Sequence, residues 1–375
     1  MMLLFDILSA LIFLKIRSYS DCPGAMANVF TAVPAQTPGP RKPGQLSDAQ
    51  LKQFFQDGFL QLDHFFEPDR ELQPCRDATE RLVDVLAHKL YDAKKIDDLF
   101  ESFPLESRLI KLNEAFPGAS ILMHKNSEFP KAYQDLWTNE RLLNIMEQLV
   151  GPEIVGHPVW NLRPKTPNLT AGIVPWHQDS GYLDARSDQT LMITCWIPLV
   201  DTNKENGCLQ VVRGGHRRGV VAPHRGCWRD TWYIWTEEKD LEEHLGVRMQ
   251  EDVVTCEVPY GGLLMFSNMM PHRSLPNHSE QTRWSLDLRY QLDGQPHGFE
   301  GVKKSILLRS ANQPDHLPDF HAFNAVDRHV TALAGWHQGQ DELQLDARIA
   351  GPWMKRWPLV HHNAHTQLLS QTASA

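Results

Sequence analysis

The stretch TLMITCWIPLVDTNKENGCLQVV, residues 190–212, decides the fold of this chain. Two apolar runs flank a turn that is rich in Asp, Asn, Lys and Gly. Short apolar runs bounded by such turn residues are typical of buried β-strands. We therefore predict a strand, a turn and a second strand here, in the middle of a β-rich region.

Similar apolar runs lie on both sides of this unit, separated by turn clusters. They occupy residues 154–160, 252–258, 262–266 and 283–292. Several short strands at this spacing favour an antiparallel β-sandwich or barrel. Regular strand texture fades beyond about residue 305, and residues 323–336 suggest a short helix.

The pattern before residue 153 is helical. Ser47 is followed three residues later by Gln50, as in a capping box, and Gly58 suits the end of the helix that starts there. Residues 59–62 suggest a short strand, and further helices are expected at 70–89 and 129–150. Because helices come first and strands later, we expect an α+β protein with helices packed outside a β-core.

The chain divides into three parts. We expect a flexible leader over residues 1–45, one domain over residues 46–310, and a C-terminal extension over residues 311–375 that packs on the core and ends in a frayed tail. The first 25 residues are interpreted either as a non-native extension of the reading frame or as a targeting segment. Their unbroken apolar run, residues 7–14, is too short to span a bilayer.

Composition narrows the class of protein. The chain has 375 residues, 42% of them apolar, and a net charge of −9 without a Lys/Arg block, so nucleic acid is not an expected partner. Six cysteines without a CxxC pair indicate neither a disulfide framework nor a zinc site. We expect a monomer or homodimer without a stable membrane span, in the cytoplasm unless the N-terminal segment directs it to an organelle.

Pro175-Trp176-His177-Gln178-Asp179 places a histidine and a carboxylate two residues apart. On a strand, such residues face the same side, so both can reach one metal ion. His272, after the run at 262–266, is the best third ligand, with His278 as the rival. Two histidines and one carboxylate form the ligand set of non-haem Fe(II) oxygenases, which leaves positions open for a keto-acid and O₂.

A keto-acid needs a cation for its distal carboxylate, and Arg283 opens the run at 283–292. If His272 ends one strand and Arg283 opens the next, a hairpin brings both into one pocket. The arginine fork can give a carboxylate two parallel hydrogen bonds, and Ser285 lies on the same strand face. Arg289 also lies on that face and is the rival, but its distance from His272 is less suitable.

These pieces together resemble the phytanoyl-CoA dioxygenase family of Fe(II)/2-oxoglutarate oxygenases, over roughly residues 46–300. LSDAQLKQFFQDGFLQLDHFF at 46–66 is similar to the family's opening helix and strand, and the HQD at 177–179 to its metal motif. Residues 194–212 are similar to its central strand–turn–strand. Arg213-Gly214-Gly215-His216 stands where the family usually has Pro-Gly-Ser-His, and the spacing from His272 to Arg283 is also the family's.

The resemblance implies a double-stranded β-helix core, also described as jelly-roll or cupin-like, with flanking helices. It implies a dioxygenase that uses Fe(II), 2-oxoglutarate and O₂ to hydroxylate a small molecule, with release of succinate and CO₂ and support from ascorbate. By position it implies that Trp196, Trp160 and Asn161 contact 2-oxoglutarate. Asp179 favours hydroxylation, since family halogenases carry a small residue there.

The alternatives are other outcomes of the same chemistry, namely desaturation, cyclisation or demethylation, and a non-catalytic ligand-binding member of the fold. The substrate stays open. Gln178 and Tyr182, beside the metal motif, are candidates for its pocket. Trp232 and Trp235 belong to an aromatic cluster that either packs as core under a loop or forms a wall over the substrate.

Overall fold

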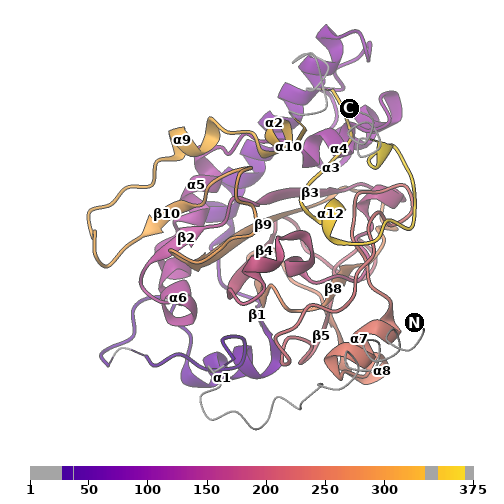
Figure 1. The fold of residues 1–375 in the computed structure, drawn as a ribbon. Helices are drawn as coiled ribbons and strands as arrows, with labels where there is room; N and C mark the ends of the chain where they lie inside the picture. The colour runs from indigo at the N-terminus through magenta and orange to yellow at the C-terminus, as the bar shows by residue number, and fades with distance from the viewer. Residues whose placement is uncertain (1–27, 37, 334–344, 368–375) are drawn as a thin grey trace, which may run out of the picture.

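The computed structural model describes residues 28–36, 38–333 and 345–367, and its centre is a pair of antiparallel sheets (Figure 1). The larger sheet has the order β1-β7-β4-β9-β2-β10, and β3 also pairs with β9. Its strands are β1 (Phe59–Leu62), β2 (Ile154–Gly156), β3 (Asn161–Lys165), β4 (Met192–Pro198), β7 (Leu263–Ser267), β9 (Arg283–Leu292) and β10 (Ile306–Arg309).

The smaller sheet has the order β6-β5-β8. Its strands are β5 (Leu209–Val212), β6 (Val253–Cys256) and β8 (His272–Ser274). The chain passes from β4 in the larger sheet to β5 in the smaller one, and it returns to the larger sheet from β8 to β9. The two sheets form the predicted double-stranded β-helix, and the α+β class is confirmed.

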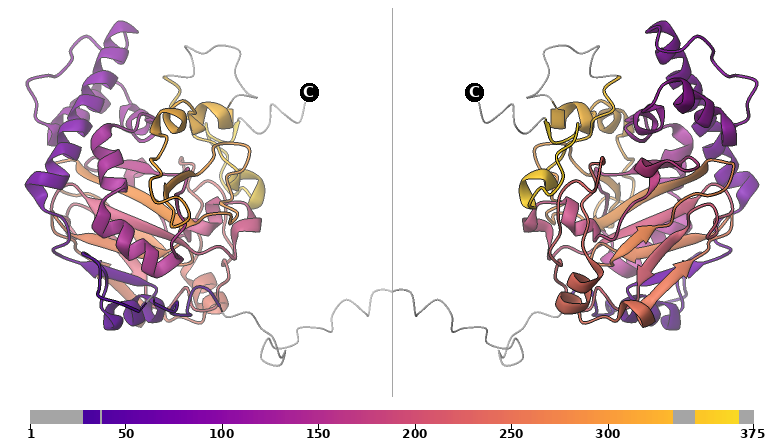
Figure 2. Two further views of the ribbon diagram at one scale, coloured as in Figure 1. Left: turned by 90° about the vertical axis from the view of Figure 1, so that its left-hand side faces the viewer. Right: turned by 90° about the vertical axis from the view of Figure 1, so that its right-hand side faces the viewer.

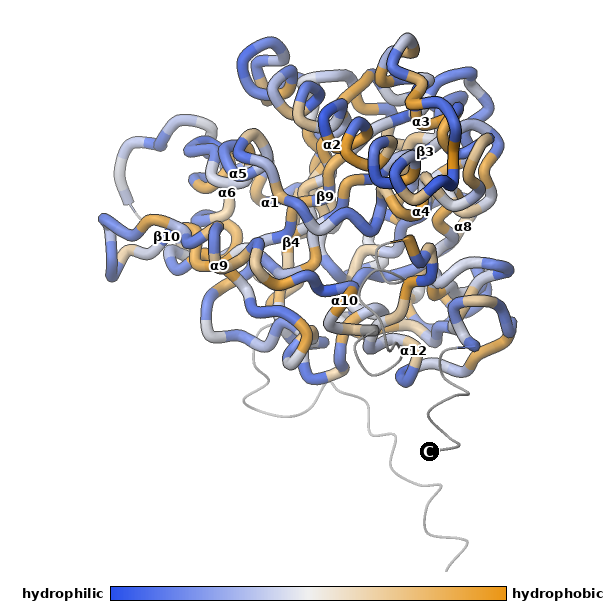
Figure 3. Tube along the Cα trace, turned by 90° about the horizontal axis from the view of Figure 1, so that it is seen from above, coloured by the Kyte–Doolittle hydropathy of each residue, from blue (hydrophilic) through white to orange (hydrophobic). Residues whose placement is uncertain are grey.

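Helices from the N-terminal part cover the outer face of the larger sheet (Figure 2). Polar and apolar residues alternate along these helices, because each has one buried face (Figure 3). The helices before β2 are α1 (Asp48–Asp57), α2 (Gln73–Asp92), α3 (Leu105–Ala115), α4 (Ala119–His124), α5 (Lys131–Trp137) and α6 (Glu140–Val150). Later helices are α7 (Glu238–Leu245), α8 (Met249–Asp252), α9 (Phe320–Asn324), α10 (Arg328–Leu333) and α12 (Trp353–Arg356).

The start of α1 agrees with the sequence pattern. Ser47 accepts a hydrogen bond from the Gln50 main chain, and the Gln50 side chain accepts one from the Ser47 main chain, which confirms the capping box. Gly58 ends the helix with φ +85°, and a Cβ at this position would overlap the side chains of His216 and Met270. Glycine is therefore required here both by backbone conformation and by space.

Three predicted elements differ from the structure. The helix expected at 129–150 is two helices, because Asn139 accepts hydrogen bonds from the main chain of residues 141 and 142 and starts α6 anew. The helix expected at 70–89 begins as a π-helical turn, Pro68–Leu72, before α2. Beyond residue 305 the sequence shows no regular strand pattern, yet the structure has β10 there. The helix expected at 323–336 is two helices, α9 and α10, as far as residue 333. Residues 334–336 lie outside the described residues.

The ends of the described chain contact the folded body. The first 27 residues lie outside the described part, but Phe30 of the expected leader is buried and Lys42 pairs with Glu147. In the C-terminal extension, Trp353 donates a hydrogen bond to the main chain of Trp232. No helix in the described part of the chain has the length and apolar character needed to cross a membrane.

Candidate metal centre and adjoining cavities

His177 and His272 are joined through their main chains. The His177 N–H donates to the His272 carbonyl at 3.0 Å, and the His272 N–H donates back at 2.9 Å. His272 opens β8, whereas Asp179 opens a 3-10 turn, Asp179–Tyr182. His177 forms a β-bridge with His272 and Gln178 is extended, but Asp179 already begins the turn, so the two residues do not belong to one regular strand as predicted.

The three side chains converge. Asp179 Oδ1 lies 3.7 Å from His177 Nε2 and 3.9 Å from His272 Nε2, and the ligand atoms of all three lie within 4.8 Å of one another. Each Nδ1 faces a main-chain carbonyl, that of Pro175 at 2.8 Å and that of Met270 at 2.9 Å. Because a carbonyl only accepts, each Nδ1 carries the proton and each Nε2 keeps its lone pair for a metal ion.

The charge states also suit a metal site. Burial and the neighbouring His177 lower the pKa of His272 to about 3, so its imidazole is neutral. Burial alone raises the pKa of Asp179, but Arg289 and the two histidines hold that pKa well below its ordinary value. Two imidazole nitrogens and one carboxylate oxygen on one side of a buried point fit an Fe(II) ion with open positions.

Asp179 is held by two partners on its far side. Thr194 Oγ1 donates to Asp179 Oδ2 at 2.8 Å, and Arg289 Nη2 donates to the same oxygen at 3.1 Å. These bonds turn Oδ1 toward the histidines. Arg289, the rival candidate for the arginine that binds the keto-acid, therefore forms an ion pair with the predicted ligand Asp179.

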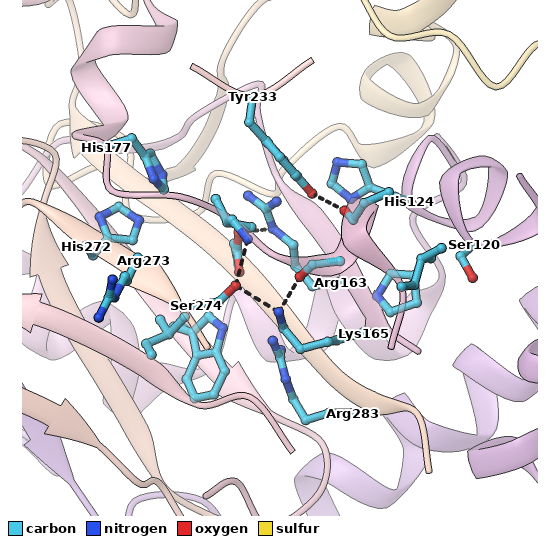
Figure 4. A pocket seen from close by; sticks show the side chains of 18 of the residues that line it. Ser120, His124, Arg163, Lys165, His177, Tyr233, His272, Arg273, Ser274 and Arg283 are labelled. Carbon is cyan, nitrogen blue, oxygen red and sulfur yellow. Dashed lines mark hydrogen bonds and ion pairs between the residues drawn. The ribbon is translucent and has the colours of Figure 1, made fainter. Parts of the chain in front are cut away.

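The first cavity extends from the two histidines to Arg283 (Figure 4). Arg283 is buried, and its Nη1 donates to Ser285 Oγ at 2.6 Å. Its guanidinium lies 5.3 Å from the ring of Trp196. Among the described residues no carboxylate lies within ion-pair distance of Arg283, and its Nε has no hydrogen-bond partner.

The route from His272 to Arg283 differs from the expected hairpin. His272 opens β8 in the smaller sheet, and Arg283 opens β9 in the larger one, so the connection crosses between the sheets. Both side chains nevertheless line the first cavity. Because the two sheets close on each other, the side chains of His272 and Arg283 meet although their strands are not paired.

Lys165 is a second buried basic residue in the first cavity that the sequence reasoning missed, and burial with the neighbouring Arg283 holds its pKa well below the ordinary value. Its Nζ donates to Ser274 Oγ at 2.9 Å and to the main chain of Gly172. In the register of β3 on β9, Lys165 lies directly opposite Arg283. Alternating basic residues in β3, Arg163 and Lys165, are the signal that could have indicated it.

The second cavity adjoins the first, and Asp179 lines it. The ring of Tyr182 lies 5.4 Å from that of His177 and 5.2 Å from that of Trp353. Trp232 lines both cavities and stacks on His124 at 5.4 Å. Of the predicted substrate residues, the structure thus brings Tyr182 and Trp232 to the second cavity.

Other predicted site residues lie elsewhere. Trp160 is packed in the core against Phe129 and lines neither cavity, because its side chain points away from the site. Gln178 is buried and engaged by the main chains of residues 220, 222 and 269, so it fixes a turn. Trp235 packs on Arg225, 5.2 Å away. Asn161 lines the second cavity instead of the first.

A model of the phytanoyl-CoA dioxygenase family matches residues 54–285. The chain belongs to this family. The matched range contains all three candidate metal ligands and Arg283. It ends before α9, α10 and α12, which belong to the C-terminal extension.

Curated relatives match part of the chain. A 1-deoxypentalenic acid 11-beta-hydroxylase of Streptomyces arenae is 25% identical over 177 residues, which cover 45% of this chain and 60% of that protein. A phytanoyl-CoA dioxygenase of Arabidopsis thaliana is 28% identical over 153 residues, covering 41% of this chain and 49% of that protein. The chain thus spans about half to three fifths of these relatives.

Among solved structures, the chain is similar to the non-haem monooxygenase ThoJ in its apo form, with a TM-score of 0.49 and 18% identity. The match covers 78% of this chain and 96% of that one. A second similar structure is the alpha-ketoglutarate-dependent carbocyclase SnoK from nogalamycin biosynthesis, with a TM-score of 0.43 and 16% identity, covering 75% and 95%.

Proposed function

We propose that this chain is an Fe(II)- and 2-oxoglutarate-dependent dioxygenase that hydroxylates a C–H bond of a small organic substrate. One observation carries the proposal. The first cavity has His177 and His272, which form a metal site together with Asp179, at one end and the buried Arg283, without a carboxylate partner among the described residues, at the other. A dicarboxylate with one chelating end is complementary to that pair of ends.

The residues of the first cavity have distinct tasks. Arg283, with Ser285 and Lys165 beside it, would bind the distal carboxylate of 2-oxoglutarate, which supplies the counter-ion that the buried Arg283 lacks. Trp196 packs against the Arg283 guanidinium and limits where the co-substrate can lie.

The metal site would be held in shape by the protein. His177 and His272 would present their Nε2 atoms, and Thr194 and Arg289 would keep Asp179 turned toward them. A bound iron would supply activation of O₂ and oxidation of the C–H bond. Burial of the ligands would exclude water from that chemistry.

The test combines metal binding with turnover. His177→Ala is expected to lose Fe(II) or Co(II) in equilibrium dialysis by more than the 10- to 100-fold that loss of an outer partner costs, and to lose succinate formation from 2-oxoglutarate. The matched control is His278→Ala, since His278 is exposed and lines neither cavity.

Two results would contradict the proposal. Wild-type protein that forms no succinate with Fe(II), ascorbate and a panel of small substrates would not be this kind of enzyme. His177→Ala with wild-type metal binding would remove the ligand assignment. Incorporation of one oxygen atom from isotopically labelled O₂ into the product would separate hydroxylation from desaturation.

A further inference from the structure

The second cavity contains three arginines, and two of them are paired. Arg163 Nε lies 2.8 Å from Asp287 Oδ2, and Arg289 Nη2 lies 3.1 Å from Asp179 Oδ2. The third, Arg328, is 6% exposed and has no carboxylate within ion-pair distance among the described residues. A buried cation without a counter-ion is costly, so a ligand that supplies one is favoured.

The hydrogen bonds of Arg328 to described residues use only some of its N–H donors. Its Nη2 donates to Asn161 Oδ1 at 2.9 Å and its Nη1 donates to the Pro158 carbonyl at 3.4 Å. A guanidinium has five N–H donors, so these two neutral acceptors leave the charge and further donors available to the cavity. Burial lowers the pKa of Arg328 to about 9, which leaves it charged at neutral pH.

His329, the next residue, provides a second and independent sign of a polar ligand. It lines the second cavity, is buried, and its Nε2 has no hydrogen-bond partner among the described residues. Buried polar side-chain atoms without partners are uncommon in folded proteins. Two adjacent residues of α10, Arg328 and His329, therefore line one cavity and retain hydrogen-bonding capacity that the described residues do not use.

Much of the remaining cavity wall is apolar. Trp353 donates its Nε1 hydrogen bond to the Trp232 carbonyl at 3.1 Å, which fixes one aromatic wall against another. The remaining apolar walls come from separate segments of the chain: Val159, Leu183, Met192, Phe299, Ile349 and Ala350. Ligand sites commonly combine such apolar walls with a few polar groups that fix orientation.

We propose that the second cavity binds the substrate as a compact apolar monocarboxylate, with its carboxylate on Arg328 and its hydrocarbon body against Trp232 and Trp353. A single uncompensated guanidinium matches one carboxylate better than a multiply charged phosphate. That the ligand is a substrate rests on the proposed function, whereas its binding to Arg328 does not. The C–H bond to be oxidised would then lie toward Asp179, which lines the same cavity.

The test measures binding to metal-free protein, so that it does not depend on turnover. The probes are cyclohexane-, decalin- and adamantanecarboxylate, each with its uncharged methyl ester, followed by tryptophan fluorescence and calorimetry. Wild-type protein is expected to bind the best acid about 10- to 100-fold more tightly than its ester, the worth of a hydrogen bond to a charged group. 2-Oxoglutarate is present at saturation, to keep the acids from Arg283.

Substitutions locate the effect. Arg328→Met should reduce the acid-to-ester ratio to about one. Arg328→Gln, which keeps a donor for Asn161, should do the same if the methionine variant folds poorly. Arg309→Met is the matched control, because Arg309 pairs with Glu140 at the surface and lines neither cavity, and it should keep the wild-type ratio.

The outcomes separate the two proposals. No preference for any acid in the wild type, or an unchanged preference in a folded Arg328→Gln variant, would overturn the assignment of Arg328. If acids bind through Arg328 but 2-oxoglutarate neither binds nor yields succinate, the cavity assignment stands and the dioxygenase function fails. If 2-oxoglutarate is consumed but the acids bind no better than their esters, the dioxygenase function stands and the assignment of the second cavity fails.

Discussion

Arg283 and Arg328 are chemically alike and structurally different. Both are buried at the end of a cavity, and neither has a carboxylate within ion-pair distance among the described residues. Arg283 opens β9, which hydrogen-bonds to β2, β3 and β4 at the centre of the larger sheet. Arg328 opens α10, a short helix of the C-terminal extension that lies beyond the range matched by the family model.

The difference indicates how the two cavities are built. A side chain on a central strand is held by the hydrogen bonds of its neighbours, so its position is tied to the fold itself. A side chain on a peripheral helix is held by a few contacts, here those to Asn161 and Pro158. We infer that the end proposed for 2-oxoglutarate is part of the core, while the end proposed for the substrate can change without disturbing it.

Arg283→Met should produce the largest separation of the two cavities. Loss of a buried charged partner costs about 2 to 5 kcal/mol, so the Kd for 2-oxoglutarate should rise by about 30-fold or more. Binding of the acid probe through Arg328 should stay within about twofold of wild type. Calorimetry with each ligand checks both, and equal weakening of both ligands would show that the cavities are not separate sites.

Arg289→Met should act on the metal site between the cavities. Without Arg289, Asp179 keeps Thr194 as a partner but loses its ion pair. Removal of an outer partner of this kind lowers metal affinity about 10- to 100-fold. Equilibrium dialysis with Co(II) measures the change. A variant with wild-type metal affinity would mean that Thr194 alone orients the carboxylate.

Trp353→Phe should affect the second cavity alone. The change removes the hydrogen bond to the Trp232 carbonyl and part of an aromatic wall. One such bond is worth about 1 kcal/mol, so acid binding should weaken about fivefold while 2-oxoglutarate binding is unchanged. Fluorescence is ambiguous in this variant because a tryptophan is lost, so calorimetry is the measurement. An effect on 2-oxoglutarate would tie the extension to both cavities.

Ser47→Ala should have the smallest effect and should touch neither cavity. It removes the side-chain acceptor that caps α1. The free energy of unfolding should fall by about 1 kcal/mol, as measured by chemical denaturation. Both ligands should bind as in the wild type, which makes this variant the control for indirect effects of lower stability. Weaker binding of either ligand here would show that global stability influences the other measurements.

The sequence predicts the parts of the site that depend on local pattern. Short stretches of sequence predict the helix cap at Ser47 and the strand runs. They also contain the two informative pairs, His177 with Asp179 and His272 with Arg283. The course of the backbone between these residues cannot be predicted in this way. The 3-10 turn at Asp179 and the crossing from β8 to β9 depend on how the two sheets close on each other. The sequence pattern indicates the three candidate ligands, although Asp179 lies in a 3-10 turn and not in a regular strand.

Residues that act through tertiary packing escape the sequence. Lys165 becomes a partner of Arg283 only through the register of β3 on β9. Arg328 lies in a segment without strong periodicity, and its role depends on contacts to residues far away in the chain. Trp160 shows the converse, since the family pattern places it at the co-substrate whereas its ring packs against Phe129 and lines neither cavity.

The reciprocal main-chain hydrogen bonds between His177 and His272 have a consequence for how the protein opens. Neither amide can exchange its hydrogen with solvent unless the other segment also moves away. The two amides should therefore report a single opening event in hydrogen-exchange measurements, although they are far apart along the chain. If these two amides exchange as slowly without iron as with it, the metal site is already formed in the metal-free protein.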